Sequence, residues 1–323
     1  MKKVVVYLLA MVAILPFGPI SCMIAVSENP AGAADTALQQ ELRERVETLC
    51  SAPRYGATLK QAEEWIAHEL EAADWQVRLQ EFENGNERFV NIIAERKGRE
   101  PGRYIIGAHY DACDSVPRGE NPGADDNASG VAALLAVAKR LPKDPRYTVE
   151  LVFYACEEPP WFGTPGMGSA HHAASCRAEE VRGMICLEML GCFRHDGAPG
   201  ESYFPGSRLI LPSEDNFVAV IGDFDSISLA RKAYAALCPR LPTVRLNLPF
   251  AHDTALWFSD HRNYAPLGIP SIMITDTAML RNKNYHMTTD TPDTLCYNCM
   301  AHITEAVAQL ISQLTNNREI GVF

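Results

Sequence analysis

Histidine and acidic residues follow several short apolar runs in this sequence. His109 and Asp111 come after one such run, Glu157 and Glu158 come after another, and Glu188 ends a third. Imidazole nitrogens and carboxylate oxygens are common zinc ligands. Adjacent carboxylates at the end of a buried strand repel each other and lose hydration unless cations neutralise them. These residue types therefore indicate metal-dependent chemistry.

Two further segments carry the same residue types. Residues 123–130 contain the adjacent Asp125 and Asp126 and precede a helix of small residues. A helix cap explains one aspartate, because carboxylates are favourable at the positive end of the helix dipole. Two metal ions bridged by one carboxylate account for the presence of both aspartates. The second segment, residues 284–291, places His286 before another carboxylate.

Taken together, these segments supply five metal ligands, one from each: His109, Asp125, Glu158, Glu188 and His286. Two zinc ions that share one bridging carboxylate, assigned here to Asp125, need five such side chains and leave a position for water. Glu157 is not needed as a ligand and is predicted to act as the general base. Each motif alone has an ordinary explanation, such as a hydrogen bond between His109 and Asp111. The prediction therefore rests on the set.

The elements that would position these side chains alternate between strands and helices. Strands are predicted over residues 89–95, 104–108, 148–155, 183–189, 217–221 and 267–274, and helices over residues 37–50, 59–73, 128–141, 169–178, 226–237 and 300–314. This alternation predicts an α/β fold with three α/β/α layers around a central mixed, mostly parallel, twisted sheet. Ligands bind such sheets at the carboxyl ends of the strands.

The chain is predicted to hold a leader over residues 1–33 and a single domain over residues 34–323. Residues 192–249 are rich in Gly, Pro and polar residues and are interpreted as an excursion near the site. Two lysines and an apolar stretch open the chain, as in a signal peptide. Cleavage after Ala33, lipid attachment to Cys22 and an uncleaved membrane anchor are the alternatives. An exported protein, extracellular or periplasmic, is expected, with soluble export preferred and a lipoprotein anchor as the alternative.

Composition narrows the classes of partner. The formal net charge is -11 and no basic cluster occurs, which argues against nucleic acid as a partner. The ten cysteines follow no disulfide framework. Cys296 and Cys299 form a C-x-x-C pair, but no second pair completes a tetrahedral zinc site. A local disulfide or two plain thiols is therefore expected there.

The ordered motifs resemble the co-catalytic di-zinc peptidase family that includes bacterial leucyl aminopeptidase, glutamate carboxypeptidase and, as a relative, glutaminyl cyclase. The similarity runs from about residue 45 to residue 314. Its motifs lie at residues 107–111, 122–130, 157–158, 188–189, 259–261 and 285–295. The resemblance implies the zinc exopeptidase fold and two zinc ions per chain.

By this resemblance, His109 and Glu188 hold one ion, Glu158 and His286 hold the other, and Asp125 bridges them. Asp111 and Asp126 lie beside the ligands, Asp111 as the partner of His109, and a cis peptide bond is expected between Asp125 and Asp126. Tyr285 resembles a tyrosine that stabilises the oxyanion in some members; packing is the alternative. The function implied is aminopeptidase hydrolysis of peptides, with Glu157 taking a proton from a water that bridges the two metals.

Three other functions are weighed. A carboxypeptidase or dipeptidase of the same fold would need a fixed cation for the substrate carboxylate, for which Arg281 and Arg262 are candidates. Glutaminyl cyclase would use one zinc ion. A binding protein without catalysis would be expected to have lost ligands, which this sequence retains. Two departures from the resemblance are Glu188, where many relatives have Asp, and the long aromatic link at residues 159–166, a substrate pocket or an apolar cover.

Overall fold

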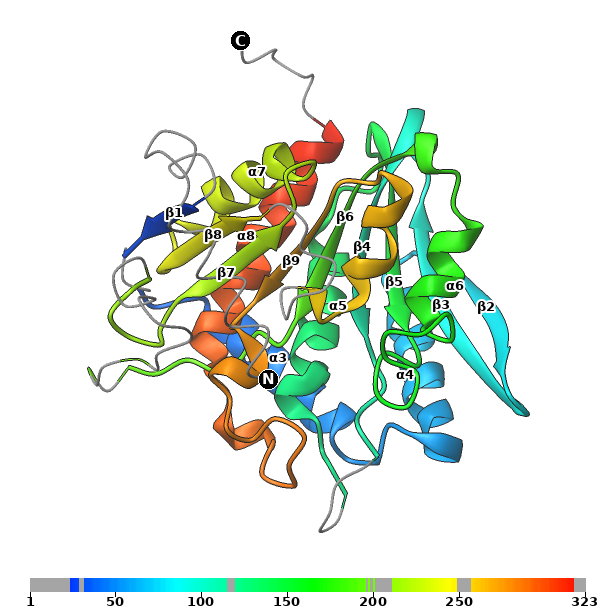
Figure 1. Ribbon diagram of the computed structural model, residues 1–323, viewed down its shortest axis with the longest axis horizontal. Coiled ribbons are helices and arrows are strands. Elements are labelled where there is room, and N and C mark those ends of the chain that lie inside the picture. The colour runs from blue at the N-terminus through cyan, green and yellow to red at the C-terminus, as the bar shows by residue number, and fades with distance from the viewer. Residues whose placement is uncertain are drawn as a thin grey trace.

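In the part of the chain that the computed structural model describes, nine strands form one mixed sheet (Figure 1). The structure describes residues 24–28, 32–114, 120–195, 197, 200, 211–248 and 257–316. The strands are β1 (Ile24–Ser27), β2 (Gln76–Asn84), β3 (Glu87–Arg96), β4 (Glu100–His109), β5 (Tyr147–Tyr154), β6 (Val181–Glu188), β7 (Val218–Gly222), β8 (Thr243–Asn247) and β9 (Ser271–Thr275). Their order across the sheet is β1-β8-β7-β9-β6-β4-β5-β3-β2.

The strands at the centre of the sheet, β9, β6, β4 and β5, run parallel. Antiparallel pairs join β7 to β9 and β3 to β5, and a further antiparallel pair lies at each edge of the sheet. His109 is level with Tyr154, the last residue of β5, and Glu188 is level with Thr275, the last residue of β9. Parallel strands end at the same edge of a sheet, so the central strands deliver their terminal side chains to one place.

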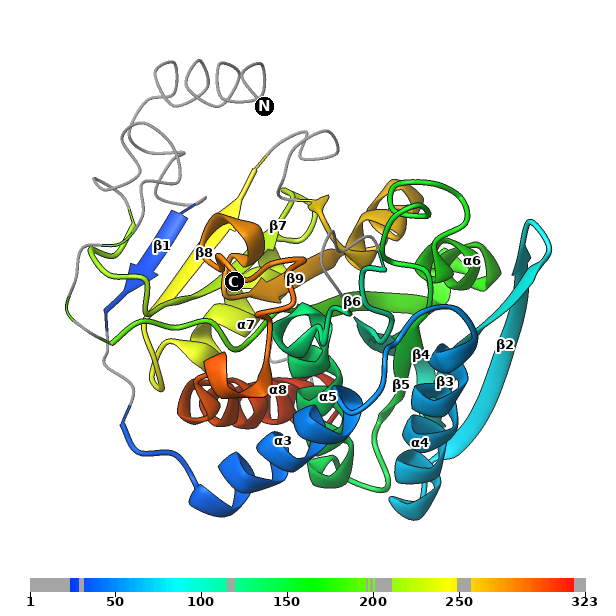
Figure 2. The same cartoon turned by 90° about the horizontal axis from the view of Figure 1, so that it is seen from below.

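Helices cover both faces of the sheet (Figure 2). One face carries α3 (Thr36–Leu49), α4 (Leu59–Ala72), α5 (Gly130–Arg140), α7 (Ile227–Leu237) and α8 (Tyr297–Asn316). On the other face lie α6 (Gly168–Ser175) and the segment with Tyr264 and Ile269. Because the sheet is buried on both sides, residues 104–109 of β4 and nearly all of β5 are buried without alternating between exposed and buried positions. The predicted three-layer α/β fold is confirmed.

Three strands were absent from the sequence prediction. β2 is an edge strand with mostly polar and exposed residues, and β1 and β8 are short, so none forms a long apolar run. The predicted strand at residues 267–274 begins only at Ser271, because a short 3-10 helix and the left-handed Gly268 precede it. β7, α7 and β8 come from the predicted excursion, and both strands pair into the central sheet.

The predicted leader falls largely outside the described residues, and Cys22 lies there with it. β1, within the predicted leader, pairs with β8 along Ile24–Ser27. Among the helices that the structure describes, none has the length and apolar character required to cross a bilayer.

Candidate metal centre

His109 is the last residue of β4, and its imidazole is fully buried. Its Nδ1 lies 3.4 Å from Oδ1 of Asp111, which is the partner that the sequence predicted. Asp111 also accepts hydrogen bonds from the backbone N–H groups of Glu157 and Glu158, at 3.2 and 3.1 Å. One carboxylate therefore orients the histidine and fixes the loop that carries both glutamates.

Asp126 lies between the two predicted histidine ligands. Its Oδ1 is 3.3 Å from Nε2 of His109, and its Oδ2 is 3.2 Å from Nε2 of His286. The backbone N–H of Asp126 donates to Asp290, the carboxylate that follows His286 in the sequence. A carboxylate with one oxygen toward each histidine has the arrangement expected of a ligand shared by two metal sites.

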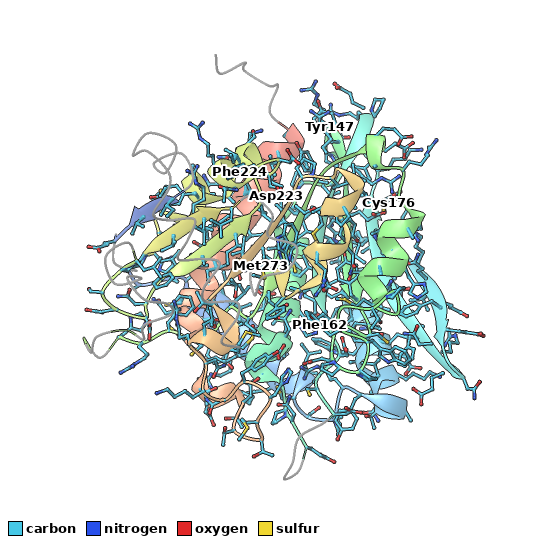
Figure 3. The ribbon with its side chains drawn as sticks, in the orientation of Figure 1. Tyr147, Phe162, Cys176, Asp223, Phe224 and Met273 are labelled. Atoms are coloured by element: carbon cyan, nitrogen blue, oxygen red, sulfur yellow. The ribbon has the colours of Figure 1, made fainter. Side chains whose placement is uncertain are left out.

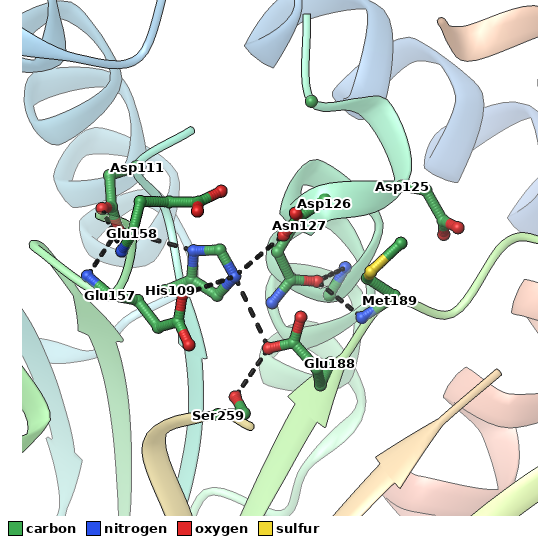
Figure 4. A network of polar contacts seen from close by, with 12 residues as sticks. His109, Asp111, Asp125, Asp126, Asn127, Glu157, Glu158, Glu188, Met189 and Ser259 are labelled. Carbon is green, nitrogen blue, oxygen red and sulfur yellow. Dashed lines mark hydrogen bonds and ion pairs between the residues drawn. The ribbon is translucent and has the colours of Figure 1, made fainter. Parts of the chain in front are cut away.

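Each histidine has a second carboxylate beside it. Nε2 of His109 is 3.5 Å from Oε2 of Glu188, and Nε2 of His286 is 2.9 Å from Oε2 of Glu158. Glu157 is more distant, with its Oε2 4.0 Å from Nε2 of His109. The structure thus brings four of the five predicted ligands together and leaves Glu157 at the edge of the cluster. Figure 4 shows three of the four, His109, Glu158 and Glu188, together with Asp126 and Glu157.

Asp125, the predicted bridge, points away from this cluster (Figure 4). Its Oδ1 accepts a hydrogen bond from the backbone N–H of Gly191 at 2.8 Å, and its Oδ2 accepts one from the Asn282 amide at 2.7 Å. Its pKa is raised well above the usual value by burial and by Asp276 beside it. Asp125 is therefore not placed for the predicted bridging role, and Asp126 is the carboxylate that lies between the two histidines.

The cis peptide bond also lies one residue later than predicted, between Asp126 and Asn127. The Asn127 side chain bonds to three backbone groups: it donates to the Leu187 carbonyl and accepts from the N–H groups of Gly130 and Met189. These bonds attach the turn to the end of β6. Sequence spacing alone does not distinguish two adjacent aspartates, whereas the direction of the backbone at this turn does.

Arg54 fixes the backbone of the turn before Asp126 through hydrogen bonds. Its buried guanidinium donates to the carbonyls of Pro122, Gly123, Tyr110 and Leu49. Gly123 has a positive φ of 58°, and a Cβ atom there would collide with the carbonyl of Asp126. Glycine is required because an L side chain fits neither the conformation nor the space.

Crowding of buried carboxylates shifts their ionisation. Burial raises the pKa of Glu158 to about 8, with a further contribution from Asp126. Burial also raises the pKa of Glu157, and repulsion from Glu188 and Glu158 adds to this, although His109 acts in the opposite direction. Asp126 is the exception: burial opposes ionisation, but both histidines bring its pKa below the usual value. The site therefore favours a positive occupant beside Asp126.

A metal pair fits this donor set. Among the described residues, Nε2 of His109, Nε2 of His286, Oδ2 of Asp126 and Oε1 of Glu158 are buried and lack a hydrogen-bond partner. Unpaired buried polar atoms are costly, and a coordinated cation would satisfy them. His109, Asp126 and Glu188 form one group with ligand atoms close enough for one ion, and Glu158 and His286 belong to another.

Comparison with known proteins identifies the family. Residues 91–311 match peptidase family M28. This chain belongs to that family. Uncharacterized protein YfbL of Escherichia coli K12 is 38% identical over 298 residues, which are 89% of this chain and 90% of that protein. Leucine aminopeptidase 1 of Arthroderma otae is 25% identical over 274 residues, 79% of this chain and 67% of the relative.

Solved structures share the M28 fold seen here. An aminopeptidase from Aneurinibacillus sp. strain AM-1 superposes with a TM-score of 0.65 at 15% identity, covering 88% of this chain and 96% of that one. Porphyromonas gingivalis glutaminyl cyclase gives 0.64 at 20% identity, covering 86% and 98%. At these identities the likeness shows the fold alone. The predicted resemblance to co-catalytic zinc peptidases is confirmed by the M28 match and by the relatives' names.

Tyr285 lies beside the centre of this M28 protein. Its ring stacks on that of His286, with centroids 3.8 Å apart. The pKa of Tyr285 is raised by burial and by the nearby carboxylates of Asp126 and Glu158, so its hydroxyl stays protonated beside the cluster. The position is compatible with both predicted alternatives, packing and stabilisation of an oxyanion.

The aromatic link after Glu158 divides into two parts. Trp161 packs on the core beside Phe89. Phe162, labelled in Figure 3, contacts Phe258 with ring centroids 5.5 Å apart and carries Arg262 over its face. Trp161 thus packs against the core, whereas Phe162 contacts the exposed Phe258.

Three supporting residues of the M28 site received no role in the sequence analysis. Ser259 donates to Oε2 of Glu188 at 2.6 Å. Asp290 accepts from the backbone N–H groups of both aspartates at the turn, and Asn127 attaches that turn to β6. Ser259 and Asp290 were within the quoted motifs, so their presence was visible, but their contacts were not.

Proposed function

We propose that this chain is a di-zinc aminopeptidase that removes N-terminal residues from peptides. One observation carries the proposal: Asp126 directs one oxygen to His109 and the other to His286. Each histidine has its own additional carboxylate, Glu188 or Glu158. The M28 match and the leucine aminopeptidases among the relatives support peptides as substrates.

His109 and Glu188 would hold one zinc ion, His286 and Glu158 the other, and Asp126 both. Bound metal ions in such a pair acidify a coordinated water and polarise the substrate carbonyl. Asp111 keeps His109 in the tautomer that presents Nε2 to the site, because Nδ1 is directed to the Asp111 carboxylate. Ser259 orients Glu188 through its hydrogen bond.

Glu157 is the proposed general base. Its buried carboxylate lies at the edge of the ligand set, next to Glu158 and near His109. The raised pKa of Glu157 makes it a stronger base than an ordinary glutamate, which suits acceptance of a proton and its return to the leaving amine. The hydroxyl of Tyr285, whose ring stacks on His286, would donate a hydrogen bond to the substrate oxyanion.

The environment of the candidate arginines favours an aminopeptidase over a carboxypeptidase. Arg281 is buried, and its guanidinium donates to the carbonyls of Cys192 and Phe217. Arg262 lies over the ring of Phe162. Arg281 is thus engaged by backbone carbonyls and Arg262 by an aromatic ring, which supports the aminopeptidase as the first candidate.

A panel of aminoacyl chromogenic substrates tests the proposal, with and without a chelator and after zinc is restored. Hydrolysis should be chelator-sensitive, restored by zinc, and abolished when the substrate amine is acetylated. Cleavage of amine-blocked peptides at the carboxyl end would instead support a carboxypeptidase. No chelator-sensitive hydrolysis across the panel would contradict the proposal.

Glutaminyl cyclase activity is the second candidate, because cyclases are among the structural neighbours. A peptide with an N-terminal glutamine separates the two. Cyclisation retains every residue and releases ammonia, whereas an aminopeptidase releases free glutamine. Mass spectrometry of the products, together with the number of zinc ions per chain, decides between them.

Export of the protein is also a proposal. The pairing of β1 with β8 supports a mature chain that retains residues 24–27. Gly32 further accepts hydrogen bonds from Asn298 and His302 of α8. Cleavage before Cys22 keeps these contacts, whereas cleavage after Ala33 removes them. The mass of the N-terminal peptide of the protein isolated from its host distinguishes the two cleavage sites.

A further inference from the structure

The C-x-x-C pair has a third partner that the sequence did not reveal. Nε2 of His195 lies 3.4 Å from Sγ of Cys296 and 3.4 Å from Sγ of Cys299. The three ligand atoms all lie within 4.8 Å of one another. His195 is about one hundred residues away from the cysteines in sequence, so only the fold brings them together.

We propose that His195, Cys296 and Cys299 form a third metal site, for a thiophilic divalent cation such as Zn²⁺, separate from the proposed catalytic pair. Zn–S bonds of about 2.3 Å and Zn–N bonds of about 2.0 Å at tetrahedral angles place nitrogen and sulfur about 3.5 Å apart. The observed separations match this value without rearrangement.

The environment of Cys296 favours a metal-binding thiolate. Cys296 immediately precedes α8, where the positive end of the helix dipole stabilises an anion. Cys299 is buried and His195 is exposed, so the proposed site lies close to the surface of the protein.

The cluster joins two segments that carry proposed catalytic ligands. His195 follows Glu188 at the end of β6, and Cys296 follows His286. Close to the cluster, the backbone N–H of Cys296 donates to the Gly191 carbonyl at 2.8 Å. Leu295 packs on Gly191 so closely that a Cβ there would lie 2.8 Å from its Cδ2. A metal at this point would lock the two segments together.

Cobalt substitution distinguishes the two kinds of site. The proposed catalytic pair has only nitrogen and oxygen ligands, whereas the third site has two thiolates, which give sulfur-to-cobalt charge-transfer absorption in the near ultraviolet. The full chain is reduced with a phosphine, stripped with a chelator and titrated with Co²⁺. The charge-transfer band should appear in the wild type and be lost in Cys296→Ser and Cys299→Ser.

Cys113→Ser is the matched control, because Cys113 lies in the group with Glu158 and His286 and is the thiol that could contribute a band from the catalytic pair. That variant should retain the band. In zinc-loaded protein, Cys299→Ser should contain one zinc ion fewer per chain than the wild type, whether or not the chain proves to be an aminopeptidase. His195→Ala should require at least tenfold more Co²⁺ to develop the band.

Three results would overturn the proposal. The first is reduced wild-type protein without a charge-transfer band. The second is a band that survives in the Cys296→Ser and Cys299→Ser variants or disappears in Cys113→Ser. The third is a Cys296–Cys299 disulfide in the isolated protein combined with no thiolate-bound metal after reduction.

Discussion

Asp125 and Asp126 are adjacent, yet their carboxylates serve different parts of the molecule. Asp126 lies between the two histidines of the metal centre, whereas Asp125 accepts hydrogen bonds from the Gly191 N–H and the Asn282 amide. Both backbone N–H groups donate to Asp290, so one carboxylate fixes the turn. Side-chain direction therefore makes Asp126, and not Asp125, the proposed bridge.

Replacement of each aspartate by asparagine tests this assignment. Asp126→Asn should lose bound zinc, because an amide presents only one oxygen and cannot ligate two ions equally. Asp125→Asn should keep its zinc and lose about 1 to 3 kcal/mol of unfolding free energy, since its buried hydrogen bonds are impaired. Elemental analysis and chemical denaturation measure the two effects. Zinc loss in Asp125→Asn with zinc retained in Asp126→Asn would reverse the assignment.

Removal of the Glu157 carboxylate should separate catalysis from metal binding. Glu157→Ala and Glu157→Gln should keep zinc content near that of the wild type and lower kcat by about two to four orders of magnitude, because general acid–base catalysis contributes that much. Steady-state kinetics on the best chromogenic substrate, with metal analysis of the same samples, gives the answer. Wild-type kcat in either variant would remove Glu157 from the mechanism.

Ser259→Ala should weaken one zinc site without removing a ligand. The hydroxyl of Ser259 donates to Glu188 at 2.6 Å, and loss of such an orienting bond costs about 10- to 100-fold in metal affinity. Competition with a chromogenic chelator measures the affinity. Ser271→Ala is the matched control, since Ser271 is also buried and its hydroxyl donates to the carbonyl of Ile269. An equal loss of affinity in both variants would point to general destabilisation.

Stabilisation by zinc should increase as pH rises from 6 to 8. In the metal-free protein the pKa of Glu158 is raised to about 8, from about 4.5 in the unfolded chain. The contribution of Glu158 to the stability of the metal-free fold is therefore fully present below pH 4.5 and is lost as the pH rises through 8. The pKa of His286 is raised to about 12 by Asp126 and Glu158, against the effect of burial, so His286 must also release a proton to bind metal. Asp126 is already ionised throughout this range.

The measurement is the difference in Tm between zinc-saturated and chelated protein at pH 6, 7 and 8. Each proton displaced by zinc adds up to about 1.4 kcal/mol of zinc-linked stability per pH unit. A Tm difference that stays constant or shrinks with rising pH would show that these groups do not release protons on zinc binding.

The sequence by itself determined the layers of the fold and most of the donor set. The inner parts of β4, β5 and β6 are buried and mostly apolar because both faces of the sheet are covered, so the polar residues at the ends of these runs stand out in the sequence. That physical constraint made His109, Glu158 and Glu188 recognisable. Exposed or short strands such as β2 and β8 lack the pattern, so they were not found.

Only the tertiary structure decided which of two adjacent carboxylates faces the histidines. The choice depends on the backbone at Gly123 and on the bonds that Asn127 and Asp290 make across the fold. Composition and spacing are the same for either aspartate. The meeting of His195 with Cys296 and Cys299 was hidden for the same reason, because contacts between distant segments depend on how the chain returns to the sheet.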